Sequence, residues 1–143
     1  GTALEEARKN AEINHFTNMT FVQADVFDYL EEMKEGEFDL IILDPPAFTK
    51  SRKTVKQAYY GYKRINLEAM KKLENGGFLA TCSCSRYMET SLFEQMLKEA
   101  ALEANVLLKQ VSVTQQNHDH PILWSMEETS YLKFFIFRIV KEK

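Results

Sequence analysis

The chain has 143 residues, enough for one domain with a single hydrophobic core. Its hydrophobic content of 45% and charged content of 27% are ordinary for a globular domain. No apolar run approaches the roughly 20 residues needed to span a membrane, and no secretory signal is visible. The net charge of −3 argues weakly against a nucleic-acid partner.

The charges are unevenly distributed along the chain. Eight basic residues and one acid, Glu68, lie between Lys50 and Lys72, whereas acids outnumber bases in the rest of the sequence. This basic segment predicts either a face that follows the phosphates of a nucleic acid or a solvated helix face rich in lysine. Charge alone favours neither interpretation.

The two cysteines, Cys82 and Cys84, are too close in sequence for an ordinary structural disulfide. A reducing, cytoplasmic setting therefore fits best. Cys-Ser-Cys supplies only two metal ligands, and His118 and His120 lie in a different segment, so we expect no metal site.

Hydrophobic periodicity predicts alternating helices and strands. The predicted helices cover residues 3–14, 26–33, 54–73 and 90–105, and the predicted strands cover residues 20–24, 38–43, 78–83, 106–114 and 131–140. This alternation predicts an α/β fold with a mainly parallel sheet and helices on both faces. Because no helix separates the last two strands, we expect them to form an antiparallel hairpin at one end of the sheet.

Two stretches carry the chemistry. Asp44-Pro45-Pro46 ends a buried apolar strand, and Thr81 to Ser85 ends the next strand. The carboxyl edge of a parallel sheet is where such folds bind ligands. We therefore expect a carboxylate, Asp44, and a thiol, Cys84, to face one cleft.

The sequence resembles the class I S-adenosylmethionine-dependent methyltransferases. It is most similar to the bacterial large-subunit ribosomal RNA cytosine-C5 methyltransferases that carry an N-terminal PUA domain. The resemblance rests on these residues: Ala3-Leu4-Glu5-x-Ala7-Arg8-x-Asn10, Asp25-Val26-Phe27, Asp44-Pro45-Pro46-x-Phe48, Gly61-Tyr62-Lys63-x-Ile65-Asn66, Gly76-Gly77, Ser83-Cys84-Ser85, Asp119-His120-Pro121 and Tyr131-Leu132-Lys133.

The resemblance implies a Rossmann-like sheet with strand order 3-2-1-4-5-7-6. It also implies that residues 1–143 are the C-terminal portion of the catalytic domain, lacking its first two strands, the glycine-rich cofactor loop and the RNA-binding domain. In that case the strand at Thr20–Ala24 loses its neighbours. We expect it to pair with the strand at Phe38–Leu43 or with another chain in a homodimer, and we expect the isolated chain to be inactive.

The resemblance also assigns a cofactor site for S-adenosyl-L-methionine. Asp25 accepts a hydrogen bond from the adenine amino group, and Val26 and Phe27 cover the edge of the ring. Asp44 and Pro45 complete the predicted cofactor contacts. The alternative for Asp25 is a helix N-cap, a common role of Asp before a helix.

Cys84 is the predicted nucleophile and Asp44 its catalytic partner. Cytosine C5 is a poor nucleophile, so addition of a thiolate to C6 is needed before C5 attacks a methyl group. Asp44 would bind the N3/N4 edge of the base. A cationic neighbour must favour the thiolate, and Arg86, Lys63 and Lys133 are candidates. The alternatives are that Cys84 is a small buried residue and that Asp44 only ends a strand.

The predicted RNA-contacting residues belong to two loops, one helix and one strand. Phe48 either stacks on a base or anchors its loop. His120 either transfers a proton or is fixed in its loop by hydrogen bonds. The full set is Pro46, Phe48, Lys50, Lys63, His120 and Lys133.

Two other functions compete with a cytosine-C5 methyltransferase. A methyltransferase acting on guanine N7 has a similar acid-Pro-Pro loop but needs no thiol, so Cys84 discriminates between the two. A non-catalytic fragment that only contacts RNA or protein is the second alternative.

Overall fold

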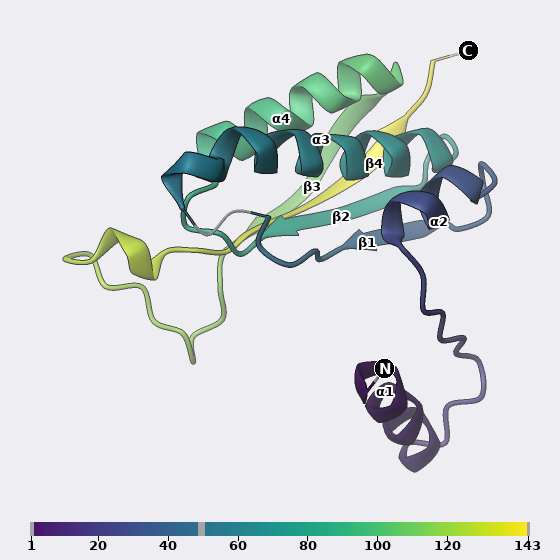
Figure 1. Ribbon diagram of the computed structural model, residues 1–143. Coiled ribbons are helices and arrows are strands. Elements are labelled where there is room, and N and C mark those ends of the chain that lie inside the picture. Colours follow the sequence, from purple (N-terminus) through teal and green to yellow (C-terminus); the bar gives the residue numbers. More distant parts are fainter. Residues whose placement is uncertain (1, 49–50, 143) are drawn as a thin grey trace.

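The computed structural model describes residues 2–48 and 51–142 (Figure 1). Its elements, in chain order, are α1 (Thr2–Ile13), α2 (Val26–Glu32), β1 (Leu40–Leu43), the 3-10 turn η1 (Arg52–Thr54), α3 (Val55–Lys72), β2 (Phe78–Ser83), α4 (Thr90–Ala104), β3 (Leu107–Thr114), the 3-10 turn η2 (Glu127–Thr129) and β4 (Lys133–Val140). The predicted alternation is confirmed with one exception. None of the helices in the described ranges is long and apolar enough to cross a membrane.

The exception is the predicted strand at Thr20–Ala24. These residues form no strand, and the sheet partner of β1 is β2, so the predicted pairing with Phe38–Leu43 is wrong. Residues with strand propensity form a strand only where a neighbour satisfies their backbone groups. The segment between α1 and α2 runs instead as an open connection, and α1 lies apart from the sheet (Figure 1).

The sheet has four strands in the order β1-β2-β4-β3. β1 and β2 are parallel, whereas β4 is antiparallel to both β2 and β3. The predicted hairpin of the last two strands is therefore confirmed. The order also agrees with the 4-5-7-6 half of the order expected from the family resemblance.

The sequence predicted helices on both faces of the sheet, and this prediction is wrong. Figure 1 shows α3 and α4 side by side on one face, and α2 packs beside α3. The reason is topological. From β1 to β2 to β3 the chain advances in one direction across the sheet, and right-handed crossovers then place both connecting helices on the same side.

Burial along the strands follows this arrangement. Ile41 is 8% exposed beneath the helices, whereas its neighbour Ile42 is 62% exposed on the opposite face. Successive side chains of a strand point to opposite faces, so β1 alternates between core and surface. The open face carries further exposed apolar side chains, among them Leu40, Phe78 and Leu107.

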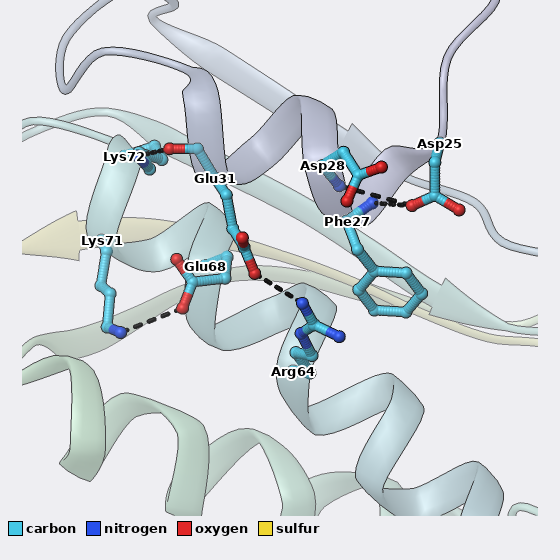
Figure 2. A network of polar contacts seen from close by, with 8 residues as sticks. All are labelled: Asp25, Phe27, Asp28, Glu31, Arg64, Glu68, Lys71 and Lys72. Atoms are coloured by element: carbon cyan, nitrogen blue, oxygen red, sulfur yellow. Dashed lines mark hydrogen bonds and ion pairs between the residues drawn. The ribbon is translucent and has the colours of Figure 1, made fainter.

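Polar contacts fix α2 against α3 (Figure 2). Arg64 of α3 donates a hydrogen bond to Glu31 of α2, and its guanidinium lies 4.8 Å from the centre of the Phe27 ring. Lys72 donates to the backbone carbonyls of Glu31 and Met33 at the end of α2. These contacts position the Asp25 end of α2 relative to the sheet.

Candidate active site

The loops that follow β1 and β2 meet at the carboxyl edge of the sheet. Leu43 and Thr81 are paired in the parallel register, so Asp44 and Cys82 follow side by side. The Cys82 Sγ donates a hydrogen bond of 3.2 Å to Oδ1 of Asp44 and lies 3.5 Å from the carbonyl oxygen of Leu43. The prolines at positions 45 and 46 then end β1, because they lack the N–H that a continued strand requires.

The two cysteines lie in different environments. Cys82 is buried, whereas Cys84 is exposed, so Cys84 is not the small buried residue of the alternative interpretation. Burial raises the pKa of the Cys82 thiol to about 12, and the hydrogen bond to the Asp44 carboxylate acts in the same direction. Cys82 therefore remains a protonated thiol at neutral pH.

Beneath Cys84, buried polar groups connect β2 to its surroundings. The Ser83 hydroxyl lies 3.0 Å from the hydroxyl of Tyr62 on α3. Two residues earlier on the strand, Thr81 donates to Asn66, whose side-chain amide donates to the Tyr62 carbonyl. Burial raises the pKa of Tyr62, so this phenol is neutral at physiological pH. These contacts fix the end of β2 against α3.

Lys133, the first residue of β4, pairs with Ser83, the last residue of β2. Its side chain is buried, and its Nζ donates hydrogen bonds of 2.6 Å to the carbonyl oxygens of Ser85 and Met88. The ammonium is therefore directed to the turn that follows Cys84. It does not extend from the surface, so the geometry does not favour a direct contact with a phosphate or a base.

The loop after Asp44 is held by Phe48. Its ring packs edge-on against Tyr62, with 4.6 Å between the ring centres. Gly61 lies beneath the same ring, where an added Cβ would be in ordinary contact with it at 3.6 Å. This environment favours the anchoring alternative for Phe48. Pro46, in contrast, is exposed.

Asp25 is the N-cap of α2. Its Oδ1 accepts from the backbone N–H groups of Phe27, at 2.8 Å, and Asp28, at 3.4 Å (Figure 2). The capping alternative is therefore present in the structure. The cap uses one carboxylate oxygen, and Oδ2 accepts no hydrogen bond from the described residues. Asp25 can thus cap the helix and still accept from an exocyclic amino group.

Val26 and Phe27, the other residues of this predicted cofactor site, differ in exposure. Val26 is 41% exposed, which leaves its side chain accessible to a ring. Phe27 packs against the core and has the Arg64 guanidinium against its ring. Of the two, Val26 has the freer surface.

Most of the basic segment is occupied by internal contacts. Lys63 pairs with Glu99 and Glu103 of α4, which links α3 to α4. Arg64, Lys71 and Lys72 also bind groups of the chain itself. Among the described residues, the basic side chains of this segment that form neither an ion pair nor a hydrogen bond are Arg52, Lys53 and Lys56, all exposed around the start of α3. Lys50 lies outside the described residues.

A groove of about 1170 Å³ lies beside this edge. Its lining includes Arg52, Arg86, Glu89, Glu127 and Lys133. Neither Asp44 nor Cys84 lines it. This groove therefore borders the candidate site and is not the predicted cleft that Asp44 and Cys84 would share.

His120 lies in the long connection between β3 and β4. Its side chain is 63% exposed, lies 3.9 Å from the Asp119 carboxylate, and faces the Tyr131 ring edge-on at 6.3 Å. These contacts are within the loop itself. They fit the alternative in which the loop is fixed by its own side chains.

Sequence reasoning did not identify the roles of Tyr62, Ser83 and Ser85. Ser85 accepts from Tyr87 through its hydroxyl and from Met88 through its carbonyl, which closes the turn after Cys84. All three belong to motifs that the resemblance already singled out, Gly61-Tyr62-Lys63 and Ser83-Cys84-Ser85. The sequence therefore identified these motifs, but the contacts between α3 and β2 that pair their residues depend on the tertiary structure.

A mixed α/β sheet with its connecting helices on one face has the architecture of the Rossmann-like class, whose members bind ligands at the carboxyl edge of the sheet. Residues 2–132 match the family model for the methyltransferase domain, and the chain belongs to this family.

Curated relatives match nearly the whole chain. The chain is 44% identical over 141 residues to ribosomal RNA large subunit methyltransferase I of Aeromonas salmonicida, and 41% identical over 142 residues to the protein of that name from Aliivibrio fischeri. Each match covers 96% of this chain and 36% of the relative. The chain thus spans little more than a third of the length of these relatives.

Solved structures show the same fold. SMU.776, crystallised in complex with SAH, superposes with a TM-score of 0.72 at 23% identity, covering 90% of this chain and 34% of that one. TrmN from Thermus thermophilus superposes with a TM-score of 0.61 at 21% identity, covering 94% of this chain and 32% of that one. At these identities the likeness concerns the fold alone.

Proposed function

We propose that this chain is the catalytic part of an S-adenosylmethionine-dependent RNA methyltransferase that acts on cytosine C5 of large-subunit ribosomal RNA through a covalent adduct at Cys84. The names of the relatives support the reaction type and the RNA class. The finer assignment, to cytosine C5 and a cysteine adduct, rests on the arrangement of the two thiols and on the family resemblance.

The observation that carries the proposal is the division between Cys82 and Cys84. Cys82 is buried, and its thiol is held by the Asp44 carboxylate, so it is not available for attack. Cys84 is exposed at the same edge of the sheet, two residues further along. A nucleophile must be accessible to its substrate, and only Cys84 meets this requirement.

The proposed reaction begins when the Cys84 thiolate adds to C6 of the flipped-out cytosine, which makes C5 electron-rich. S-adenosylmethionine, when bound, supplies an electrophilic methyl group, which C5 takes. A base then removes the C5 proton, and the electron pair of that C–H bond re-forms the C5–C6 double bond as the Cys84 sulfur leaves. Asp44 is proposed to bind the N3/N4 edge of the base with the carboxylate oxygen that Cys82 does not engage.

The residues for the cofactor fit its adenine end. The free oxygen of Asp25 is an acceptor for the adenine amino group, and exposed Val26 offers an apolar contact to the ring. Asp44 and Pro45 are proposed to border the methyl-donor side. The 143 residues contain no Gly-x-Gly motif between a strand and a helix. We therefore expect weak cofactor binding by these residues alone.

The proposed RNA contact is electrostatic. Arg52, Lys53 and Lys56 are exposed together at the start of α3, beside the groove, and no described carboxylate pairs with them. Phosphate contacts of this kind position a substrate without reading its sequence. Pro46, exposed in the loop after Asp44, is proposed to contact the target base.

The test is methyl transfer to unmodified large-subunit ribosomal RNA by the protein that contains this chain, with the methylated position mapped. Cys84→Ala should abolish transfer, whereas the matched Cys82→Ala variant should keep it. RNA containing 5-fluorocytosine at the mapped position should form a covalent complex with wild type, because fluorine cannot leave C5 as the proton does. Transfer that survives Cys84→Ala would instead indicate attack by a ring nitrogen, such as guanine N7.

A further inference from the structure

The buried Lys133 ammonium lies against the turn that carries Cys84. Its Nζ donates to the carbonyl oxygens of Ser85 and Met88, both at 2.6 Å. Met88 N–H in turn donates to the Ser85 carbonyl at 3.2 Å, so these contacts close a single turn directly after Cys84. One side chain of β4 therefore fixes the backbone on which the proposed nucleophile is placed.

This ammonium is buried without a carboxylate partner. Lys133 is 7% exposed, and no carboxylate of the described residues lies within ion-pair distance of it. Burying a charge without a counter-charge is unfavourable, and a nearby negative charge reduces that cost. Burial lowers the pKa of Lys133, while the electrostatic effects of Cys84 and Glu89 act in the opposite direction. Cys84 therefore lies within the field of this ammonium.

The other two cationic candidates named from the sequence are engaged elsewhere. The Arg86 guanidinium lies 4.8 Å from the Tyr87 ring and donates to its hydroxyl. Lys63 pairs with two carboxylates of α4. Lys133 alone among the three is both buried and directed to the backbone next to Cys84.

We propose that Lys133 is a positioning residue for Cys84, which fixes the turn after the sulfur through two carbonyl contacts and favours its anionic form through a buried positive charge. This inference rests on the proposed function, in which Cys84 is the nucleophile. It assigns Lys133 a place beneath the reacting side chain and no contact with RNA or with the methyl donor.

The charge and the hydrogen bonds can be separated by substitution. Lys133→Arg keeps the charge and the donors, Lys133→Gln keeps donors but removes the charge, and Lys133→Met removes both. The measured quantity is the rate at which iodoacetamide alkylates Cys84 between pH 6 and 9, in a Cys82→Ala background so that one thiol remains. Titratable groups near the sulfur are Tyr62 on α3 and Lys133 on β4, with Glu89 facing Lys133 from the start of α4. Tyr62 stays neutral over this range, because its pKa is raised.

The expected result is that Lys133→Gln alkylates several-fold more slowly than its parent at pH 7, because the buried positive charge is lost and the contacts that fix the turn after Cys84 are weakened. Its rate profile should shift to higher pH, and Lys133→Arg should restore the parent profile to within about twofold. A Lys133→Gln protein that is folded by circular dichroism and shows the parent profile would overturn the proposal. If that variant does not fold, Lys133→Arg provides the measurement, because it keeps the charge and the donors. An alkylation profile of Lys133→Arg that departs from the parent profile by more than about twofold would overturn the proposal.

Methyl transfer separates this inference from the proposed function. In an active protein, Lys133→Gln should lower kcat with little change in KM for RNA, because Lys133 does not touch the RNA. If Cys84→Ala leaves methylation intact, the proposed function fails, while the alkylation profiles still decide whether Lys133 acts on the sulfur. If methylation requires Cys84 but the alkylation-rate profiles of Lys133→Gln and Lys133→Arg coincide, the inference on Lys133 fails and the proposed function stands.

Discussion

The Cys82 thiol donates a hydrogen bond of 3.2 Å to Asp44 across the two neighbouring strands β1 and β2. The bond joins the ends of these strands at the point where the acid-Pro-Pro loop begins. It also keeps Cys82 as a buried, protonated thiol with a structural role. The neighbouring Cys84 is thereby distinguished from it by accessibility.

The burial of the Cys82 thiol, together with this hydrogen bond, predicts a specific loss of stability at alkaline pH. The pKa of Cys82 rises from 9.0 to about 12 on folding, so the native state holds the proton more tightly than the unfolded state. The stabilisation is fully present below pH 9 and is lost as the pH rises from 9 toward 12, by at most about 1.4 kcal/mol per pH unit.

The Cys82→Ala variant lacks this contribution. The difference in free energy of unfolding between wild type and Cys82→Ala should be constant from pH 6 to 8 and should shrink above pH 9. Urea unfolding at a series of pH values measures it. Tyr59, whose pKa is also raised to about 12, is present in both proteins and cancels from the difference. A constant difference up to pH 11 would contradict the assignment.

Adjacent isoleucines of β1 should respond differently to truncation. Ile41 lies in the core beneath the helices, so Ile41→Ala should reduce the free energy of unfolding by about 2–5 kcal/mol. Ile42 is 62% exposed on the open face, so Ile42→Ala should cost less than about 1 kcal/mol. Chemical denaturation of the two variants compares them directly. Equal losses would mean that the open face is covered.

Asp25 should show separate effects on stability and on cofactor binding. Asp25→Ala removes the cap of α2 and should cost about 1 kcal/mol of stability, whereas Asp25→Ser retains a good N-cap and should cost little. Both variants lose the free carboxylate oxygen proposed to bind adenine. Both should therefore weaken S-adenosylmethionine binding, measured by calorimetry on the protein that contains this chain. Normal binding by Asp25→Ser would limit Asp25 to its capping role.

The unpaired basic residues should dominate the salt dependence of RNA binding. Replacing Arg52, Lys53 and Lys56 together with Gln should reduce the slope of log K against log salt by about 0.7 for each phosphate that these side chains neutralise in wild type. Lys71→Gln is the matched control, because Lys71 is already paired with Glu68. Filter binding of single-stranded RNA at several salt concentrations measures both slopes. An equal change for the control would place the RNA elsewhere.

Local sequence pattern determined most of the elements. The amphipathic spacing of apolar residues predicted α3 and α4, and the apolar run predicted β1, because a side-chain period of 3.6 or 2 reflects a buried face. The lack of a predicted α-helix between the last two strands predicted the hairpin of β3 and β4. Proline after Asp44 marked the strand end that positions the acid. These features depend on neighbours in the sequence.

Tertiary structure decided the rest. Thr20–Ala24 has strand propensity but no neighbour in the sheet, and the direction of the crossovers, which no local pattern records, placed the helices on one face. The sequence singled out Cys84 and Lys133 separately, 49 positions apart, with no means of ranking Lys133 above Arg86 or Lys63. Only the antiparallel register of β2 and β4 directs that ammonium to the Cys84 turn, because burial and pairing depend on which distant segments share a surface.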